Sequence, residues 1–301
     1  MEIISNNLDK LNIEGERALA LGFFDGLHKA HREVIANASK EALAKTVVTF
    51  KEDPSLFLSG KTEYLISDAD KEKELEKMGV KTLVKLDFNE VKNLSPECFF
   101  ETVLVKKLKA KLISCGDNYR FGYKAMGDVI LLKTLCQKHG VKLIIATPCF
   151  YEDKLISATR IRELLKNGDL KKANLMLGKN FGFKGTVITG NRIGNKFGFP
   201  TANVALPEGF IEPKFGVYAT IVTFENRKFV GVTNLGVKPT VGSDKILAET
   251  WIQNFEEDIY GKDISLEFVE FIREEKKFSS LDELKNQVFA DAEKVNSIIS
   301  L

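Results

Sequence analysis

The chain has no apolar run approaching the roughly 20 residues that a membrane-spanning helix requires. Its first stretch, residues 1–16, is acidic and does not resemble a secretory signal peptide. The 44 basic and 42 acidic residues nearly cancel to a net charge of +2, and no basic stripe with interleaved aromatic residues stands out. These absences predict a cytoplasmic protein with no nucleic-acid or membrane partner, in which any phosphate recognition is local.

Cysteines are few and scattered. None of them shows the CxxC spacing of a zinc site, and their spacing suggests no disulfide framework. We therefore expect four buried thiols, which are Cys98, Cys115, Cys136 and Cys149.

A length of 301 residues exceeds the usual domain size of about 100–150 residues and predicts two domains, residues 1–178 and 179–301. In the first, apolar strand-like runs alternate with helical patterns, one of which covers residues 28–43. The runs are residues 18–24, 46–50, 82–86, 112–115 and 142–146. This alternation predicts an α/β fold with a parallel sheet, which binds ligands beyond the carboxyl ends of its strands.

The second half contains short β-like segments separated by Gly, Pro and Asn, a texture typical of a small antiparallel barrel. The segments are residues 183–189, 216–224, 228–234, 246–255 and 264–271. A final helix is predicted from Ser280 and Glu283, which form a capping box. Its apolar face would contain Leu284, Val288, Ala292 and Val295.

A glycine-punctuated loop lies at the start of this half, where residues 191–203 read NRIGNKFGFPTAN. Gly190 and Gly198 expose backbone N–H groups, and Lys196 adds a cation, so the loop could bind phosphate. Thr201 and Asn203 stand two residues apart on one face of an extended segment, where their oxygens could hold a magnesium ion against nucleotide phosphates. A plain hairpin turn is the alternative.

A second motif lies at the first strand end, where residues 21–31 read LGFFDGLHKAH. Phe24, Asp25 and Gly26 form the turn and are candidates for contact with a nucleotide. His28 and His31 fall on one face of a first helical turn, beside the positive end of the helix dipole, which suits a triphosphate. The alternatives are a metal-ligand pair, for which only His139 remains as a third histidine, and two surface histidines.

Two later segments fit the same site. Residues 115–122 read CGDNYRFG and place Asn118 and Arg120 after another apolar strand. Residues 156–162 read ISATRIR, in which Ser157 and Thr159 can cap a helix while Arg160 or Arg162 reaches phosphate. Read alone, Ser157 is a plain helix cap. Together the three segments indicate a nucleotide cleft.

These motifs, with GFPTAN, GVTNLGVKPT, DIYGK and FIREEKKFSS, resemble those of the bacterial bifunctional riboflavin kinase/FAD synthetase family over nearly the whole chain. The resemblance implies an α/β Rossmann-like nucleotidyltransferase domain that joins FMN and ATP into FAD and pyrophosphate. A small antiparallel β-barrel riboflavin kinase domain with a C-terminal helix would follow it and convert riboflavin and ATP to FMN.

The same resemblance implies the roles of individual residues. Thr201 and Asn203 would bind Mg²⁺, and Glu249 would accept the proton of the attacking ribityl hydroxyl. A solvent-facing strand glutamate is the alternative for Glu249. The flavin would be bound by Asn118 and Arg120 in the first domain and by Arg273 in the second.

The chain departs from the family pattern at five positions, which are Ala30, Glu52, Asp53, Ala158 and Asn195. Asp53 stands where the family has a histidine, and its carboxylate would repel a polyanion. A narrower hypothesis therefore keeps the kinase and makes the first domain weak or inactive. A flavin or nucleotide sensor without turnover is a further alternative. The sequence leaves the oligomeric state open.

Overall fold

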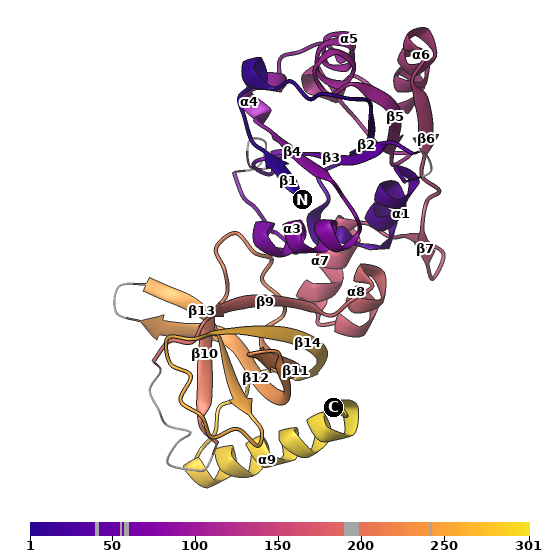
Figure 1. Cartoon of the computed structure of the whole chain (residues 1–301). Helices are drawn as coiled ribbons and strands as arrows, with labels where there is room; N and C mark the ends of the chain where they lie inside the picture. Colours follow the sequence, from indigo (N-terminus) through magenta and orange to yellow (C-terminus); the bar gives the residue numbers. More distant parts are fainter. Residues whose placement is uncertain (40–41, 55, 57–59, 190–198, 241–242) are drawn as a thin grey trace. The chain divides into compact units, whose positions relative to one another are not determined.

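The computed structural model describes residues 1–39, 42–54, 56, 60–189, 199–240 and 243–301. Its internal contacts divide the chain into two compact units, residues 1–62 with 66–158 and residues 63–65 with 159–301 (Figure 1). The second unit thus includes nearly all of α7 (Ala158–Asn167) and the whole of α8 (Leu170–Leu177). The domain boundary at residue 178 stays a prediction.

The first unit contains a six-stranded sheet in the order β1-β4-β3-β2-β5-β6, and every neighbouring pair is parallel. The strands are β1 (Glu2–Ile4), β2 (Arg17–Leu21), β3 (Ala44–Phe50), β4 (Thr82–Leu86), β5 (Ala110–Cys115) and β6 (Lys142–Ile145). From β2 the chain winds outward through β3 and β4, then returns to place β5 on the other side of β2. The carboxyl ends of β2 and β5 therefore form the switch point at which such sheets bind ligands.

Both faces of this sheet are buried, which explains the continuous apolar runs. Leu19 and Leu21 of β2 belong to one hydrophobic cluster, whereas Ala18 and Ala20 belong to another. The first cluster includes residues of the helical segments η3 (Phe99–Lys107) and α6 (Val129–His139). The second includes residues of α1 (Lys29–Asn37) and α3 (Asp68–Lys77). The predicted parallel α/β fold is confirmed.

One predicted boundary in this unit is wrong. The helical pattern over residues 28–43 exceeds α1, which ends at Asn37. Strand β3 begins at Ala44, and Ala44 pairs with Arg17 at the start of β2. The chain before Ala44 must therefore leave the helix to reach the sheet.

The second unit contains an antiparallel sheet in the order β10-β13-β12-β11-β14-β9. The strands are β9 (Phe181–Thr186), β10 (Thr201–Ala205), β11 (Gly216–Phe224), β12 (Arg227–Thr240), β13 (Ser243–Ile252) and β14 (Asp263–Arg273). An isolated bridge joins Ile188, just after β9, to Asn203 of β10. Because β9 and β10 are the two ends of the sheet order, this bridge curls the sheet as a barrel fold requires.

The two faces of this sheet differ in their side chains and in what packs against them. One face carries aromatic side chains, among them Tyr218 and Phe268. It also carries a ladder of fully buried hydroxyls in which Thr233 lies 2.7 Å from Thr220 and 2.8 Å from Thr250. The opposite face packs against α9 (Leu281–Ile298).

Helix α9 begins where the sequence predicts. The Ser280 hydroxyl accepts the backbone N–H of Glu283 at 3.1 Å, and the Glu283 carboxylate accepts the backbone N–H of Ser279 at 3.0 Å. Backbone and side-chain bonds from Ser279 and Lys276 hold the pKa of Glu283 at about 2. On the predicted apolar face, Ala292 and Val295 are buried. Leu284 and Val288 are half-buried.

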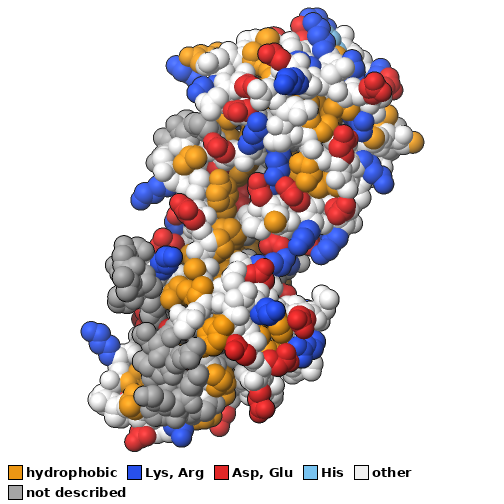
Figure 2. Space-filling view, turned by 60° about the vertical axis from the view of Figure 1, so that its left-hand side comes forward, with side chains coloured by type: hydrophobic (Ala, Val, Ile, Leu, Met, Phe, Trp, Pro, Cys, Tyr) orange, Lys and Arg blue, Asp and Glu red, His pale blue; other side chains and the backbone are white. Residues whose placement is uncertain are grey.

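Surface charge is mixed in sign. On the face shown in Figure 2, the described Lys and Arg side chains are interspersed with Asp and Glu. Among the described residues, no helix combines the length and the apolar character that crossing a membrane would require. The cytoplasmic location remains a prediction.

The expectation of four buried thiols is wrong for two of them. Cys115 and Cys136 are buried, whereas Cys98 is exposed and Cys149 is half-buried. Cys98 is the last residue of the short helix α5 (Pro96–Cys98). A helix of this length has no apolar periodicity from which the exposure of Cys98 could be predicted. Burial raises the pKa of Cys115 to about 12 and that of Cys136 to about 11, so both thiols stay protonated at neutral pH.

Candidate functional site

The turn that follows β2 has an unusual backbone. Phe24 and Leu27 adopt left-handed conformations with φ of 59° and 47°, and Gly26 between them has φ of 75°. Left-handed backbone is costly for residues with large side chains. Phe24 and Leu27 are both fully buried and Asp25 is 3% exposed, so packing holds this turn in its strained shape at the switch point of the sheet.

The turn delivers two histidines to the start of α1. His28 is the N-cap residue, and its Nδ1 accepts the backbone N–H of His31 at 3.4 Å. The two imidazole rings stack with centroids 3.6 Å apart, and the rings of Phe24 and His31 meet edge to face, with centroids 5.4 Å apart. Because Nδ1 of His28 accepts, its neutral ring carries the proton on Nε2. The predicted shared face is thus formed by an N-cap residue and a first-turn residue.

The end of β5 lies beside this turn. Ser114 of β5 is in register with Ala20 of β2, so both strands reach the same edge of the sheet together. Asn118 and Arg120, which follow β5, are both exposed. Among the described residues, the Arg120 guanidinium has one long ion pair, with Asp128 at 3.9 Å, and could also bind a ligand anion. The topology therefore brings the first two predicted segments together.

The third predicted segment spans the division between the units. Ser157 belongs to the first unit, and Thr159 and Arg162 belong to the second. Ser157 and Arg162 are half-buried, and Thr159 is exposed. The Arg162 Nε donates a hydrogen bond to the backbone carbonyl of Glu63 at 2.7 Å. This bond joins two segments of the second unit. Phosphate contact by these residues remains a prediction.

Asp53, the main departure from the family pattern, follows β3 and is 7% exposed.

Gly190, Lys196 and Gly198, which the sequence assigns to nucleotide binding, lie outside the described residues.

In the second unit, three polar residues form a row across neighbouring strands. Glu249 of β13 is in register with Asn203 of β10 on one side and with Asn234 of β12 on the other. Residues in register project from the same face of a sheet, with Cβ atoms about 5 Å apart. Thr201 lies two residues before Asn203 and therefore shares this face. Asn234 is a candidate site residue that the sequence analysis missed.

Asn203 supports the predicted magnesium site. Its side chain is 3% exposed, and its Oδ1 is buried without a hydrogen-bond partner among the described residues. A buried polar oxygen left unsatisfied is unfavourable. Amide and hydroxyl oxygens are hard ligands of the kind that magnesium takes, so Asn203 and Thr201 fit a magnesium ion. The described residues contain no group of three or more His, Cys, Asp or Glu that could hold a metal ion.

Arg273, which the resemblance assigns to the flavin, is held by α9. Its Nε lies 3.0 Å from both Asp291 carboxylate oxygens, and its Nη2 lies 2.8 Å from Oδ2. Asp291 also accepts a bond from Gln287 at 2.9 Å. This pair joins the end of β14 to α9, and a flavin role for Arg273 stays a prediction.

We expect Asp291→Asn to lower the free energy of unfolding of the second unit by about 3 kcal/mol, because it leaves a largely buried guanidinium without its counter-charge. The side chains of Arg273 and Asp291 are 23% and 4% exposed. Trp251 is the only tryptophan of the chain and lies in β13, so its fluorescence during urea unfolding reports on this unit. Glu293→Gln, at an exposed position of the same helix, is the control. Equal stability of both variants would refute the assignment.

Both halves of the chain are similar to known proteins. Residues 10–160 match the family model of FAD synthetase, and residues 177–299 match that of riboflavin kinase. A protein of Buchnera aphidicola subsp. Schizaphis graminum is 35% identical over 98% of this chain and 97% of its own length. A protein of Haemophilus influenzae is 35% identical over 92% of both chains. Each of the two is named bifunctional riboflavin kinase/FMN adenylyltransferase.

A solved structure from Streptococcus pneumoniae has a TM-score of 0.91 and 31% identity, and the match covers 100% of both chains. That protein is named a macrolide-efflux protein, which differs from the names of the two relatives.

Proposed function

Because this chain belongs to the bifunctional riboflavin kinase/FMN adenylyltransferase family, we propose that it converts riboflavin to FMN with one ATP and FMN to FAD with a second. The α/β unit carries the adenylyltransferase and the antiparallel unit carries the kinase. The observation that supports the kinase site most directly is the row of Asn203, Glu249 and Asn234, in which the buried amide oxygen of Asn203 lacks a hydrogen-bond partner among the described residues.

In the kinase reaction, an oxygen of the riboflavin ribityl chain attacks the γ-phosphorus of ATP, and the bond to the ADP oxygen breaks. Glu249 accepts the proton of the attacking hydroxyl. Thr201 and Asn203 would hold Mg²⁺, which supplies positive charge to the phosphate oxygens. The register of Glu249 with Asn203 supports these roles, because it would set the base beside the phosphates that the magnesium ion neutralises.

In the adenylyl transfer, a phosphate oxygen of FMN attacks the α-phosphorus of ATP, and pyrophosphate leaves. No protein nucleophile is needed, so catalysis consists of positioning and of charge stabilisation. His28 and His31, stacked at the N-terminus of α1, would donate to the phosphate oxygens, while Phe24, Asp25 and Gly26 shape the turn. Asn118 and Arg120 would hold FMN, and Ser157, Thr159 and Arg162 would contact the nucleotide.

A chromatographic time course of the purified protein with ATP and magnesium tests this function. Started from riboflavin, the reaction should accumulate FMN and then FAD; started from FMN, it should release FAD and pyrophosphate. FMN without any FAD from either start would favour the narrower kinase hypothesis that Asp53 motivates. Ligand binding without consumption of ATP would favour a sensor. Removal of magnesium with EDTA should stop both steps.

A further inference from the structure

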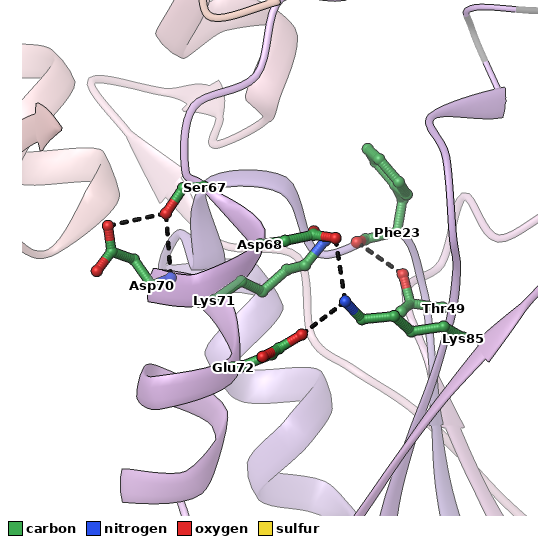
Figure 3. A network of polar contacts seen from close by, with 8 residues as sticks. All are labelled: Phe23, Thr49, Ser67, Asp68, Asp70, Lys71, Glu72 and Lys85. Carbon is green, nitrogen blue, oxygen red and sulfur yellow. Dashed lines mark hydrogen bonds and ion pairs between the residues drawn. The ribbon is translucent and has the colours of Figure 1, made fainter. Parts of the chain in front are cut away.

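A buried lysine lies next to the turn that follows β2. Lys71, in the first half of α3, has a side chain that is 5% exposed, and its ammonium is 3.1 Å from Oδ1 of Asp68. The same ammonium lies 5.1 Å from the centre of the Phe23 ring, within the range of a cation–π contact (Figure 3). Burying a charged group is unfavourable unless partners compensate for it, and here the partners are one carboxylate and one aromatic face.

A second lysine ties this pair to the sheet. The ammonium of Lys85, in β4, donates to Oδ2 of Asp68 at 3.0 Å and to Oε1 of Glu72 at 2.6 Å. Burial acts to raise the pKa of Asp68, but the ammonium groups of Lys71 and Lys85 outweigh it and hold this pKa below its ordinary value. Asp68 is therefore ionised at neutral pH and fixes both lysines to the start of α3.

Phe23 is also held through its backbone. The Thr49 hydroxyl, in β3, donates to the Phe23 carbonyl at 3.0 Å, and Figure 3 shows this contact beside the lysine cluster. Phe23 directly precedes the left-handed residue Phe24. The entry to the strained turn is thus fixed by Thr49 at the backbone and by Lys71 at the ring.

Helix α3 also holds the far end of the same turn. The Arg32 Nε, in α1, donates to the carbonyl of Leu27 at 3.0 Å, and the Arg32 Nη2 contacts Oε2 of Glu74 at 3.2 Å. Lys71 and Glu74 are three residues apart and so project from one side of α3. One side of α3 therefore supports both ends of the turn: Lys71 contacts Phe23, and Glu74 contacts Arg32, which binds the carbonyl of Leu27.

We propose that Lys71 is a positioning residue for adenylyl transfer, which rests on the function proposed above for the first unit. Its ammonium is nearly fully buried between Asp68 and the Phe23 ring, so we assign it no direct contact with a substrate. It acts through Phe23, by keeping the turn in the shape that places His28 and His31 against the phosphates. A displacement of about 1 Å in such a site can lower a rate by up to a hundredfold.

The test is Lys71→Met, which keeps most of the side-chain volume and removes the charge. We expect kcat for FAD formation from FMN to fall about tenfold, with the KM for FMN nearly unchanged because Asn118 and Arg120 follow a different strand. Lys73→Met, at an exposed position of α3, is the matched control and should behave as wild type. Phosphorylation of riboflavin by the same preparations should also be unchanged, which shows that the second unit is intact.

A double-mutant cycle with Phe23→Leu separates positioning from a merely structural role. If Lys71 acts through the Phe23 ring, the double variant should be no slower than the slower single variant, since residues that act through one contact are not additive. A structural role alone would lower the melting temperature and leave kcat as it is. Should Lys71→Met fail to fold, Phe23→Leu alone must show the same fall in kcat at constant KM.

Two results would overturn the inference alone: a folded Lys71→Met enzyme with wild-type kcat, or additive effects in the cycle. A wild-type protein that makes no FAD from FMN would instead refute the proposed adenylyltransferase, and this inference with it. The wild-type assay therefore distinguishes the two failures.

Discussion

We expect Glu249→Gln to remove the kinase activity and to leave the adenylyltransferase in place. Loss of a general base typically lowers a rate by about 10²- to 10⁴-fold, and glutamine keeps the shape of Glu249 without its ability to take a proton. The variant should therefore form almost no FMN from riboflavin, as measured by chromatography, yet form FAD from supplied FMN at the wild-type rate.

The control for this variant is Glu256→Gln, at an exposed position of the same unit, which should phosphorylate riboflavin normally. Wild-type FMN formation by Glu249→Gln would show that Glu249 is not the general base. Its register with Asn203 and Asn234 would then have another explanation.

For His28→Asn we expect the opposite result, a loss of adenylyl transfer with the kinase activity retained. Asparagine is a good N-cap residue, so α1 should keep its first turn while the imidazole is lost. Removal of one preorganised donor to a developing anion typically costs about 10²- to 10³-fold in rate. We expect FAD and pyrophosphate formation from FMN to fall by that factor, with riboflavin phosphorylation unaffected.

His139→Asn is the matched control, because His139 is the last residue of α6, outside the predicted motifs, where its Nε2 contacts Glu101 at 3.1 Å. It should leave both activities unchanged. If His28→Asn retained wild-type adenylyl transfer, the stacked histidines would serve only to start the helix. A loss of stability without a loss of rate would point the same way.

The sequence predicts the fold well where local patterns suffice. Strands of a doubly covered sheet need continuous apolar runs, and the structure places β2 to β6 on the predicted runs. Helix ends are less predictable, because α1 ends at Asn37 to let Ala44 pair with Arg17. That pairing depends on a distant strand and leaves no local signal.

The candidate site divides in the same way. Thr201 and Asn203 are close in sequence, so their shared face could be predicted from strand periodicity. The neighbourhood of Asn203, Glu249 and Asn234 depends on the register of three strands, which residue spacing does not encode. The bond between Arg273 and Asp291 likewise joins a strand to a helix 18 residues later. Residue spacing does not encode this contact, so the sequence does not reveal that the arginine predicted to bind the flavin binds the carboxylate of Asp291.

The buried hydroxyl ladder has a consequence for the kinase site on the other side of the same sheet. Thr233 and Thr250 are the sequence neighbours of Asn234 and Glu249, and they are directly opposed in the strand pairing. A slip of one strand by one residue would turn Glu249 toward the interior and would also separate these hydroxyls. The threonines therefore help to fix the register that sets Asn234 beside Glu249, although their side chains lie on the opposite face of the sheet.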